Sequence, residues 1–468
     1  MIAMISTNDI NGFFADDSTD LSESIIETYW FETSINPNFA AAALCSEQST
    51  AQWKRPCVDE DLRRTCGAKV IGLEIIEVSD KPVFEFPFNK GNRFTRCRVT
   101  IAHPYINFGT KIPNLLTAAC GEGAFHSPGI TAIKLLDIGF PKKYLNAFQG
   151  PQFGTRGIQD LLKVRDRPLF MGVVKPNIGL APKNFSEIAY QSWIGGLDIA
   201  KDDEMQSDTE ISPIAERLCL MNAKRMEAED LTGEKKIFLV NITDEVDRLV
   251  ELHDLAVKNG AGAVMVNSMT VGLSAIRMLR KHAEVPIVGH FDFIAPFSRL
   301  PFFGVSQLVI TKLQRLTGCD SIIMPGFSPR MMVDEEEVKT NVEACLAEFG
   351  DIKKSLPVPG GSDWAGTIQP LYHKLRSIDF GFVFGRGVFD HPKGAEAGAK
   401  SIRQAWEATA MGVSIEEYAK ENLELREAIE AFGKTDKVEE DSVIPAFQPE
   451  ADLLLAESGG LGKGKSKI

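Results

Sequence analysis

The chain contains the segment Gly195-Gly196-Leu197-Asp198-Ile199-Ala200-Lys201-Asp202-Asp203-Glu204, an apolar run that ends abruptly in a lysine and three carboxylates. In a strand, residues two apart point the same way, so Lys201 and Asp203 share a direction, and Glu204 can turn in from the following loop. Hard oxygen ligands without His or Cys suit Mg²⁺, and Lys201 can join them as a third anionic oxygen ligand if it carries CO₂ as a carbamate. The alternative interpretation is a solvated charge cluster at the end of a strand.

The same unit recurs through the second half of the chain: a short apolar run, a polar or glycine cluster, then a segment of helical periodicity. The eight apolar runs are Leu169–Val174, Leu197–Ala200, Ile237–Ile242, Ala263–Val266, Val285–Val288, Ser321–Met324, Leu356–Val358 and Phe380–Phe384. Helical spacing of apolar residues marks Ile214–Glu229, Glu245–Asn259, Leu273–His282, Val305–Leu316 and Glu335–Phe349. Eight strands alternating with helices predict an α/β fold with a parallel sheet closed into a (β/α)₈ TIM barrel. An open doubly wound sheet is the alternative, but its G-x-G-x-x-G turn is absent.

The rest of the chain divides around this barrel. We expect a smaller α+β domain over residues 1–150, with strands at Val70–Val78 and Cys97–Ala102 and helices near Phe39–Glu47 and Leu115–Ala119. The barrel is expected over residues 151–432, ending in helices at Ala397–Gly412 and Ile415–Phe432. Residues 433–468 are polar and rich in Glu, Lys and Gly, which predicts a flexible tail.

Composition limits the class of partner. The 468 residues carry a net charge of −13, which argues against nucleic acid or an anionic membrane as the main partner. The eight cysteines include no C-x-x-C pair and are expected to be reduced, as in a cytoplasmic protein. We also expect no signal peptide and no membrane span, since no apolar stretch approaches the ~18 residues required.

A barrel places its catalytic groups just after the strand ends, and nearly every predicted strand here ends in reactive side chains. Lys175 follows the first strand, where it could shuttle a proton or hold an enolate oxygen; a salt bridge to a nearby carboxylate is the alternative. His290 ends the fifth strand, where hydrogen bonding or acid–base chemistry becomes the better interpretation than a core histidine.

Glycine pairs follow the last two strands. Loops at these places commonly bind phosphate through backbone N–H groups, which makes Gly360, Gly361 and Gly385 candidate phosphate ligands. Arg386 could add a bidentate contact, and Arg330 after the sixth strand is a further candidate anion ligand.

The order of these motifs resembles the RuBisCO large-chain superfamily. The chain shows G-x-V-K-P at 172–176, G-G-L-D-x-x-K-D-D-E at 195–204, a strand ending in histidine, a Gly-Gly loop and G-x-G-V-F-x-H-P at 385–392. The resemblance runs from about Phe31 to Phe432. It implies a ferredoxin-like N-terminal domain before the barrel and a head-to-tail homodimer with active sites at the subunit interface.

The resemblance also assigns roles to residues. It implies that Lys201 is the carbamylated lysine, that Asp203 and Glu204 are the other Mg²⁺ ligands, and that Lys175 is the catalytic lysine. Glu47 and Trp53 are the residues that the N-terminal domain is expected to lend to a partner subunit.

This chain departs from the carboxylases of that superfamily at several positions. At four positions the residue differs: where the carboxylases have a second lysine, an arginine, a serine and an asparagine, this chain has Asn177, Phe291, Pro359 and Glu122. The sixth strand does not end in histidine, and Arg330 is the residue nearest to the position of the carboxylases' loop lysine. Each charged hydrogen bond lost to a phosphate costs about 1.5–3 kcal/mol, so a bisphosphate should bind poorly. The pattern is similar to the non-carboxylating, type IV RuBisCO-like proteins of photosynthetic bacteria.

The function implied is Mg²⁺-dependent enolisation or isomerisation of a keto-sugar with one phosphate, a methylthio sugar being one candidate. The base is either the Lys201 carbamate or Lys175. This branch is linked to sulfur metabolism and to the oxidative stress response. Two alternatives remain open: a ligand-binding or stress-regulatory protein with little turnover, and an authentic ribulose-bisphosphate carboxylase.

Overall fold

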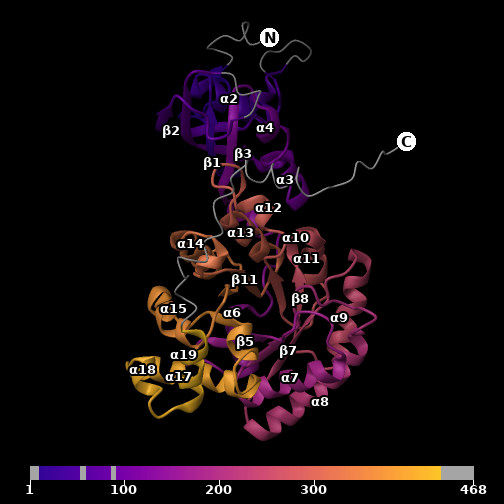
Figure 1. Cartoon of the computed structure of the whole chain (residues 1–468). Helices are drawn as coiled ribbons and strands as arrows, with labels where there is room; N and C mark the ends of the chain where they lie inside the picture. The colour runs from indigo at the N-terminus through magenta and orange to yellow at the C-terminus, as the bar shows by residue number, and fades with distance from the viewer. Residues whose placement is uncertain (1–9, 53–59, 86–90, 434–468) are drawn as a thin grey trace, which may run out of the picture.

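The computed structural model describes residues 10–52, 60–85 and 91–433. An N-terminal α+β domain stands on a larger α/β barrel, as Figure 1 shows with the first domain at the top. The expected tail lies almost entirely outside the described residues. No helix in the described part of the chain combines the length and the apolar character needed to cross a bilayer.

The N-terminal domain has the βαββαβ order of a ferredoxin-like fold. Its elements are β1 (Ser24–Thr33), α2 (Pro37–Glu47), β2 (Lys69–Ser79), β3 (Phe94–Pro104), α3 (Ile112–Ala119), α4 (Glu122–His126) and β4 (Ile130–Gly139). The strand order is β10-β4-β1-β3-β2, and β1 runs antiparallel to both β3 and β4. The ferredoxin-like prediction is therefore confirmed.

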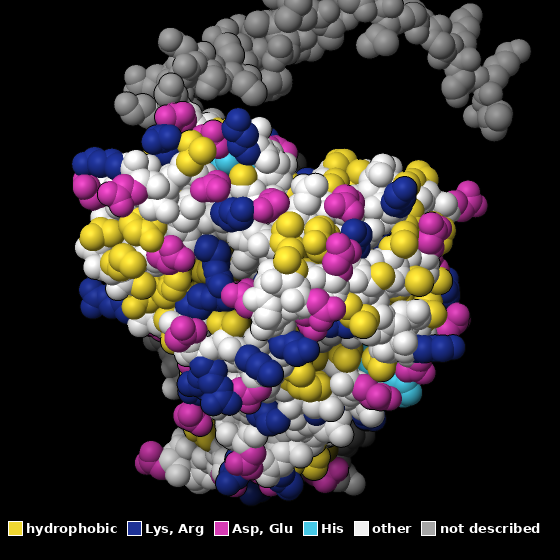
Figure 2. Space-filling model, turned by 90° about the horizontal axis from the view of Figure 1, so that it is seen from below, with side chains coloured by type: hydrophobic (Ala, Val, Ile, Leu, Met, Phe, Trp, Pro, Cys, Tyr) yellow, Lys and Arg dark blue, Asp and Glu magenta, His cyan; other side chains and the backbone are white. Residues whose placement is uncertain are grey.

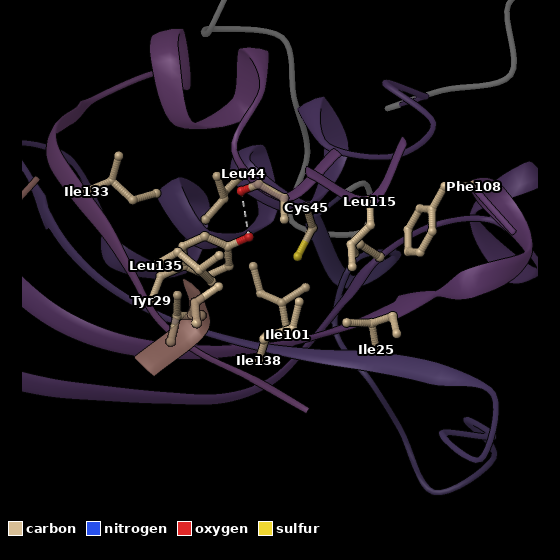
Figure 3. Close-up of a cluster of buried hydrophobic side chains, with 14 of the residues drawn as sticks. Ile25, Tyr29, Leu44, Cys45, Ile101, Phe108, Leu115, Ile133, Leu135 and Ile138 are labelled. Atoms are coloured by element: carbon tan, nitrogen blue, oxygen red, sulfur yellow. Dashed lines mark hydrogen bonds between the residues drawn. The ribbon is translucent and has the colours of Figure 1, made fainter. Parts of the chain in front are cut away.

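The core of this domain lies between the sheet and helices α2 and α3. Figure 3 shows Leu44 and Cys45 of α2 and Leu115 of α3 facing Ile25, Ile101 and Ile138 of the sheet. Tyr29 reaches into the same core and donates its hydroxyl hydrogen to the Ala119 carbonyl at 2.8 Å. This bond ties the end of α3 to the centre of the sheet.

The barrel is formed by eight parallel strands, one for each apolar run predicted from the sequence. They are β5 (Leu169–Val173), β6 (Ile199–Lys201), β7 (Ile237–Asn241), β8 (Ala263–Asn267), β9 (Ile287–His290), β11 (Ser321–Pro325), β12 (Leu356–Gly360) and β13 (Gly381–Phe384). The sheet order ends at β12 and β13, and a parallel bridge between Asp363 and Phe384 brings those ends together. The closed-barrel prediction is confirmed against the open-sheet alternative.

Helices surround the barrel. They are α5 (Lys142–Leu145), α6 (Gly154–Leu162), α7 (Pro182–Ile194), α8 (Ile214–Thr232), α9 (Leu249–Lys258), α10 (Ser268–Val271), α11 (Leu273–Arg280), α12 (Ala295–Ser298), α13 (Gln307–Thr317), α14 (Glu335–Leu346), α15 (Ile368–Leu375), α16 (Arg386–Phe389), α17 (Ala395–Met411), α18 (Ile415–Tyr418) and α19 (Leu423–Phe432). The single helix expected at Ile415–Phe432 is in fact α18 and α19, because the Asn422 amide donates to the Tyr418 carbonyl and turns the chain between them.

The two domains share more than their linker. The two-residue strand β10 (Gly304–Val305), which follows β9 along the chain, pairs in parallel with β4 of the N-terminal sheet. Val309, Leu313 and Leu316 of α13 belong to the hydrophobic core of the N-terminal domain. The surface at the opposite end of the barrel mixes acidic, basic and scattered hydrophobic side chains (Figure 2).

Candidate active site

Strand periodicity collects the functional side chains at one rim of the barrel. Alternate strand residues such as Leu239, Met265 and Val358 fill the barrel interior, while their neighbours pack outward against the helices. The next inward position on five strands carries a polar residue or a glycine: Lys201, Asn241, Asn267, His290 and Gly360. The sequence therefore places these five positions around the same opening.

Lys201 and Glu204 form the centre of the site. Lys201 is fully buried, and its Nζ donates to the Asp202 carbonyl at 2.8 Å and to Glu204 Oε2 at 3.1 Å. Burial opposes ionisation of the Glu204 carboxyl, but the nearby Lys201 ammonium and His290 ring outweigh burial and lower its pKa to about 2. Glu204 is therefore a carboxylate at neutral pH.

Lys175 and Asp203 form the second pair. The Lys175 Nζ lies 2.7 Å from Asp203 Oδ2 and donates to Asn177 Oδ1 at 2.8 Å. Asp203 is fully buried, whereas 22% of the Lys175 side chain is exposed. Lys175 makes the salt bridge considered as its alternative role, and it also keeps access to solvent and to a bound ligand.

His290 lies between the central carboxylate and Asp292. Its Nδ1 accepts the Asp292 backbone N–H at 3.3 Å, and its Nε2 lies 3.5 Å from Glu204 Oε2. An acceptor at Nδ1 assigns the proton of the neutral ring to Nε2, which faces Glu204. The ring stacks on Phe291 with 4.6 Å between ring centroids.

Buried polar groups hold the loop after β6 in place. The Asn241 and Asn267 amides donate to the Glu204 carbonyl at 2.9 and 3.0 Å. Asp202 points away from the opening and pairs with Arg217 of α8, whose Nε lies 3.0 Å from Asp202 Oδ1 with both side chains fully buried. Asp202 thus anchors the segment whose neighbours form the site.

The glycine loops border the same rim. A side chain at Gly385 would come within 3.4 Å of Lys175 Cε, which places the β13 end beside the catalytic lysine candidate. At the β12 end, the backbone N–H of Gly361 donates to the Asp363 carboxylate at 3.1 Å. The Met331 side chain covers the α-carbon of Gly361, where a Cβ would lie 2.7 Å from Met331 Cε.

The remaining predicted residues lie farther from this centre. Arg330 and Arg386 are exposed at the ends of loops beside the rim, and neither has an ion-pair partner in the described part of the chain. Glu47 is half-buried at the end of α2, in the N-terminal domain, which Figure 1 shows at the far end of the molecule from the barrel strands. Trp53 lies outside the described residues.

Sequence reasoning missed several residues of the site. Asn241 and Asn267 were recognisable as strand ends but not as supports of Glu204. Arg217 and Met331 gave no local signal, because one acts from a helix and the other from a neighbouring loop. Asp363 stands two residues after the glycine pair, and only the backbone turn reveals its contact.

The side chains at the rim fit a hard divalent cation. Asp203 and Glu204 supply carboxylate oxygens, and the nitrogen of the buried Lys201 lies beside Glu204, where its carbamate would add oxygen donors. One ligand atom each from Glu204, His290 and Asp292 lie within 4.8 Å of one another, a group that does not include Asp203, whose carboxylate is paired with Lys175. The donor set therefore suits Mg²⁺ coordination at this rim.

Comparisons with known proteins agree with this architecture. Residues 154–432 match the family model of the ribulose bisphosphate carboxylase large chain, catalytic domain. The ribulose bisphosphate carboxylase-like protein of Allochromatium vinosum is 58% identical over 92% of this chain and 94% of that protein. The protein of the same name from Chlorobaculum tepidum is 54% identical over 91% of this chain and 98% of its own length.

Solved structures give the same result. Octameric RuBisCO from Pyrococcus horikoshii, crystallised with sulfate ion, has a TM-score of 0.82 and 29% identity, covering 91% of this chain and 97% of that one. A RuBisCO-like protein (MtnW) from Alicyclobacillus acidocaldarius has a TM-score of 0.77 and 26% identity, covering 87% and 99%. The chain belongs to the RuBisCO large-chain family.

Proposed function

We propose that this protein is a non-carboxylating RuBisCO-like enzyme that enolises or isomerises a keto-sugar carrying one phosphate. The observation that carries the proposal is the cluster of Lys175, Lys201, Asp203, Glu204 and His290 at one barrel rim. Its relatives over more than nine-tenths of the chain are named RuBisCO-like proteins.

The metal ligands in this proposal are the Lys201 carbamate, Asp203 and Glu204. Members of this family generally use Mg²⁺ and a carbamylated lysine. When bound, Mg²⁺ supplies a Lewis acid for a carbonyl and the oxygen beside it. Asn241 and Asn267 keep Glu204 in position by holding its backbone carbonyl.

Proton transfer is assigned to the residues around the metal ligands. Lys175 is our candidate for the base that removes the proton beside the carbonyl, after its ammonium has released a proton to solvent, which its partly exposed side chain reaches whereas Lys201 is fully buried. Asn177 positions the Lys175 amine through a 2.8 Å hydrogen bond. His290 offers a hydrogen-bond donor, since its Nε2 proton faces into the site.

The two ends of the substrate should differ in polarity. The loops at Gly360, Gly361 and Gly385, with Arg386, are the proposed phosphate site. At the other side, Phe291 packs on the barrel interior and on His290, where a carboxylase has arginine. An apolar end, for which a methylthio group is a candidate, fits this side, and such a substrate would link the enzyme to sulfur metabolism.

We also propose that the active form is at least a homodimer. Glu47 would reach the barrel of a partner subunit, since it lies far from the barrel strands of its own chain (Figure 1). Structural neighbours described as octameric and dimeric RuBisCO support this assembly.

A second candidate is a ligand-binding or stress-regulatory protein with little turnover. Lys175 and Lys201 lie 2.7 and 3.1 Å from Asp203 and Glu204, and these two ammonium groups balance the charge of the two carboxylates without a bound cation. Because each charged group in the site then has a partner, these residues can stabilise the fold without taking part in catalysis.

Proton NMR in D₂O tests the enzymatic proposal. Mono-phosphorylated keto-sugars, including methylthio analogues, would be incubated with the protein, with Mg²⁺ and bicarbonate present or omitted. We expect deuterium to appear beside the carbonyl only when both are present, and Lys201→Ala to abolish the exchange. The matched control is Lys183→Ala, a change at an exposed lysine of α7.

Each contrary result favours one alternative. Exchange that persists in Lys201→Ala would contradict the assigned chemistry. No exchange with any sugar, together with a stable protein partner, would favour the regulatory candidate. Labelled bicarbonate appearing in phosphoglycerate from ribulose bisphosphate would identify a carboxylase instead.

A further inference from the structure

The loop after β12 turns back on itself through a carboxylate. Gly361 has φ +155° and Ser362 φ +60°, and this turn returns the Asp363 side chain to the Gly361 N–H, which donates to Asp363 Oδ2 at 3.1 Å. The Thr367 hydroxyl donates to Asp363 Oδ1 at 3.2 Å. Only 5% of Asp363 is exposed. The N–H group expected to bind phosphate is therefore already bound to an internal anion.

The loop is fixed from several sides. Asp363 forms a parallel bridge with Phe384 of β13, directly before Gly385. Gly387 of α16 lies against the Asp363 carbonyl, where a Cβ would come within 2.4 Å, and Met331 covers Gly361. These contacts fix the backbone of the loop, so the Asp363 carboxylate is held beside the Gly361 N–H and can leave it only by rotation of its own side chain.

The surroundings of Asp363 contain few compensating charges. On the neighbouring loops Arg330 and Arg386 are exposed, and Lys175, beyond Gly385, is paired with Asp203. The helices α15, α17 and α19 pack against the turn that follows Asp363, and their cations Lys374, Lys400 and Arg403 are each paired with a glutamate. No cation among the described residues forms an ion pair with Asp363. Burial raises the pKa of Asp363 to about 7, against the two hydrogen bonds that lower it.

We propose that Asp363 is a specificity-determining residue that admits an anion to the Gly361 loop only in its acid form. The bound anion takes the Gly361 N–H, and the protonated Asp363 donates its O–H to an oxygen of the anion. Where Asp363 is ionised before binding, each anion bound takes up one proton from solvent, which becomes the carboxylic acid proton, so that no second negative charge faces the ligand. This inference rests on the proposed phosphate site and adds that the protonation state of Asp363 decides whether an anion binds there.

Calorimetric titration with sulfate tests the inference on the full chain. Sulfate remains a dianion between about pH 5.5 and 8.5, whereas phosphate itself titrates in that range. We expect the affinity of the wild-type protein for sulfate to fall about tenfold per pH unit above pH ~7. Titrations in buffers of different ionisation enthalpy should show proton uptake per sulfate rising from near zero at pH ~5.5 towards one at pH ~8.5. Asp363→Asn should bind with an affinity that does not depend on pH.

Two further variants separate the possible outcomes. Thr367→Val removes a hydrogen bond to the charged form, so the fall in affinity should move to higher pH. Arg386→Met should weaken sulfate binding equally at all pH values. An unchanged pH slope in Asp363→Asn would overturn the gating role and leave the anion site standing. Absence of sulfate binding in both the wild type and Asp363→Asn would overturn the anion site as well.

Discussion

At the scale of single residues, Asp363 also makes the stability of the fold depend on pH. Its pKa rises from 3.8 to about 7 on burial, so the folded protein binds a proton that the unfolded chain releases between these values. The contribution of Asp363 to stability is fully present below about pH 4 and is lost as pH rises through about 7. Above that pH the ionised, buried carboxylate weakens the fold.

Replacement by asparagine removes this dependence while keeping the shape of the side chain. We expect Asp363→Asn to be more stable than the wild type at pH ~8.5, by up to about 4 kcal/mol, and to lose this advantage towards pH ~4. Urea denaturation at several pH values measures the difference. The exposed Asp390→Asn serves as the control, and an equal gain at every pH would contradict the assignment to Asp363.

The side chains of the site divide into those that local sequence reveals and those that it does not. Lys201, Asp203, Glu204 and His290 stood out because each lies at or just after the end of a predicted strand, and these strand ends meet at the same edge. The Asp363 contact depends on the left-handed φ of Ser362, which no pattern of apolar residues encodes. Met331 approaches Gly361 across two loops, and such an approach becomes visible only in three dimensions.

At the scale of elements, the position of β6 depends on an ion pair behind the site. Arg217 of α8 and Asp202 are both fully buried, and the Asn241 backbone N–H donates to Asp202 Oδ2 at 2.9 Å. Removing one partner of a buried pair leaves an uncompensated charge, which is strongly destabilising.

We therefore expect Arg217→Met to lower the free energy of unfolding by about 3–5 kcal/mol. The double variant Arg217→Met/Asp202→Asn should recover part of this loss, because no charge then remains buried without a partner. Chemical denaturation of the wild type, Arg217→Met, Asp202→Asn and the double variant measures the coupling. Equal stability of Arg217→Met and the wild type would show that α8 does not hold β6 through this pair.

Element prediction succeeded where one periodicity dominates. All eight barrel strands were predicted because fully buried parallel strands read as short apolar runs. In the N-terminal domain, β1 was missed, since Glu27 and Glu32 are completely buried in it and interrupt its apolar pattern. The strand β10 was missed because two residues carry no periodic signal.

At the scale of the whole molecule, the proposed dimer predicts sharing of active sites between subunits. Glu47→Gln and Lys201→Ala should each be inactive alone. Mixed and allowed to exchange subunits, they should regain roughly a quarter of wild-type activity, because half of the dimers are then mixed and each holds one intact site. The measurement is the activity of the mixed protein, assayed as deuterium exchange into the substrate. If activity does not recover although subunit exchange is proven, Glu47 belongs to the site of its own chain.

The pairing of β10 with β4 has a consequence for where the chain can be divided. The covalent linker near residue 150 does not separate two self-sufficient parts, since α13 supplies Val309, Leu313 and Leu316 to the N-terminal core. A fragment ending at the linker would expose that apolar surface and leave β4 as an open edge, where copies could join strand to strand. Gene fusions and permutations of this protein should therefore keep residues 304–316 together with the first domain, although more than 150 positions of sequence separate them.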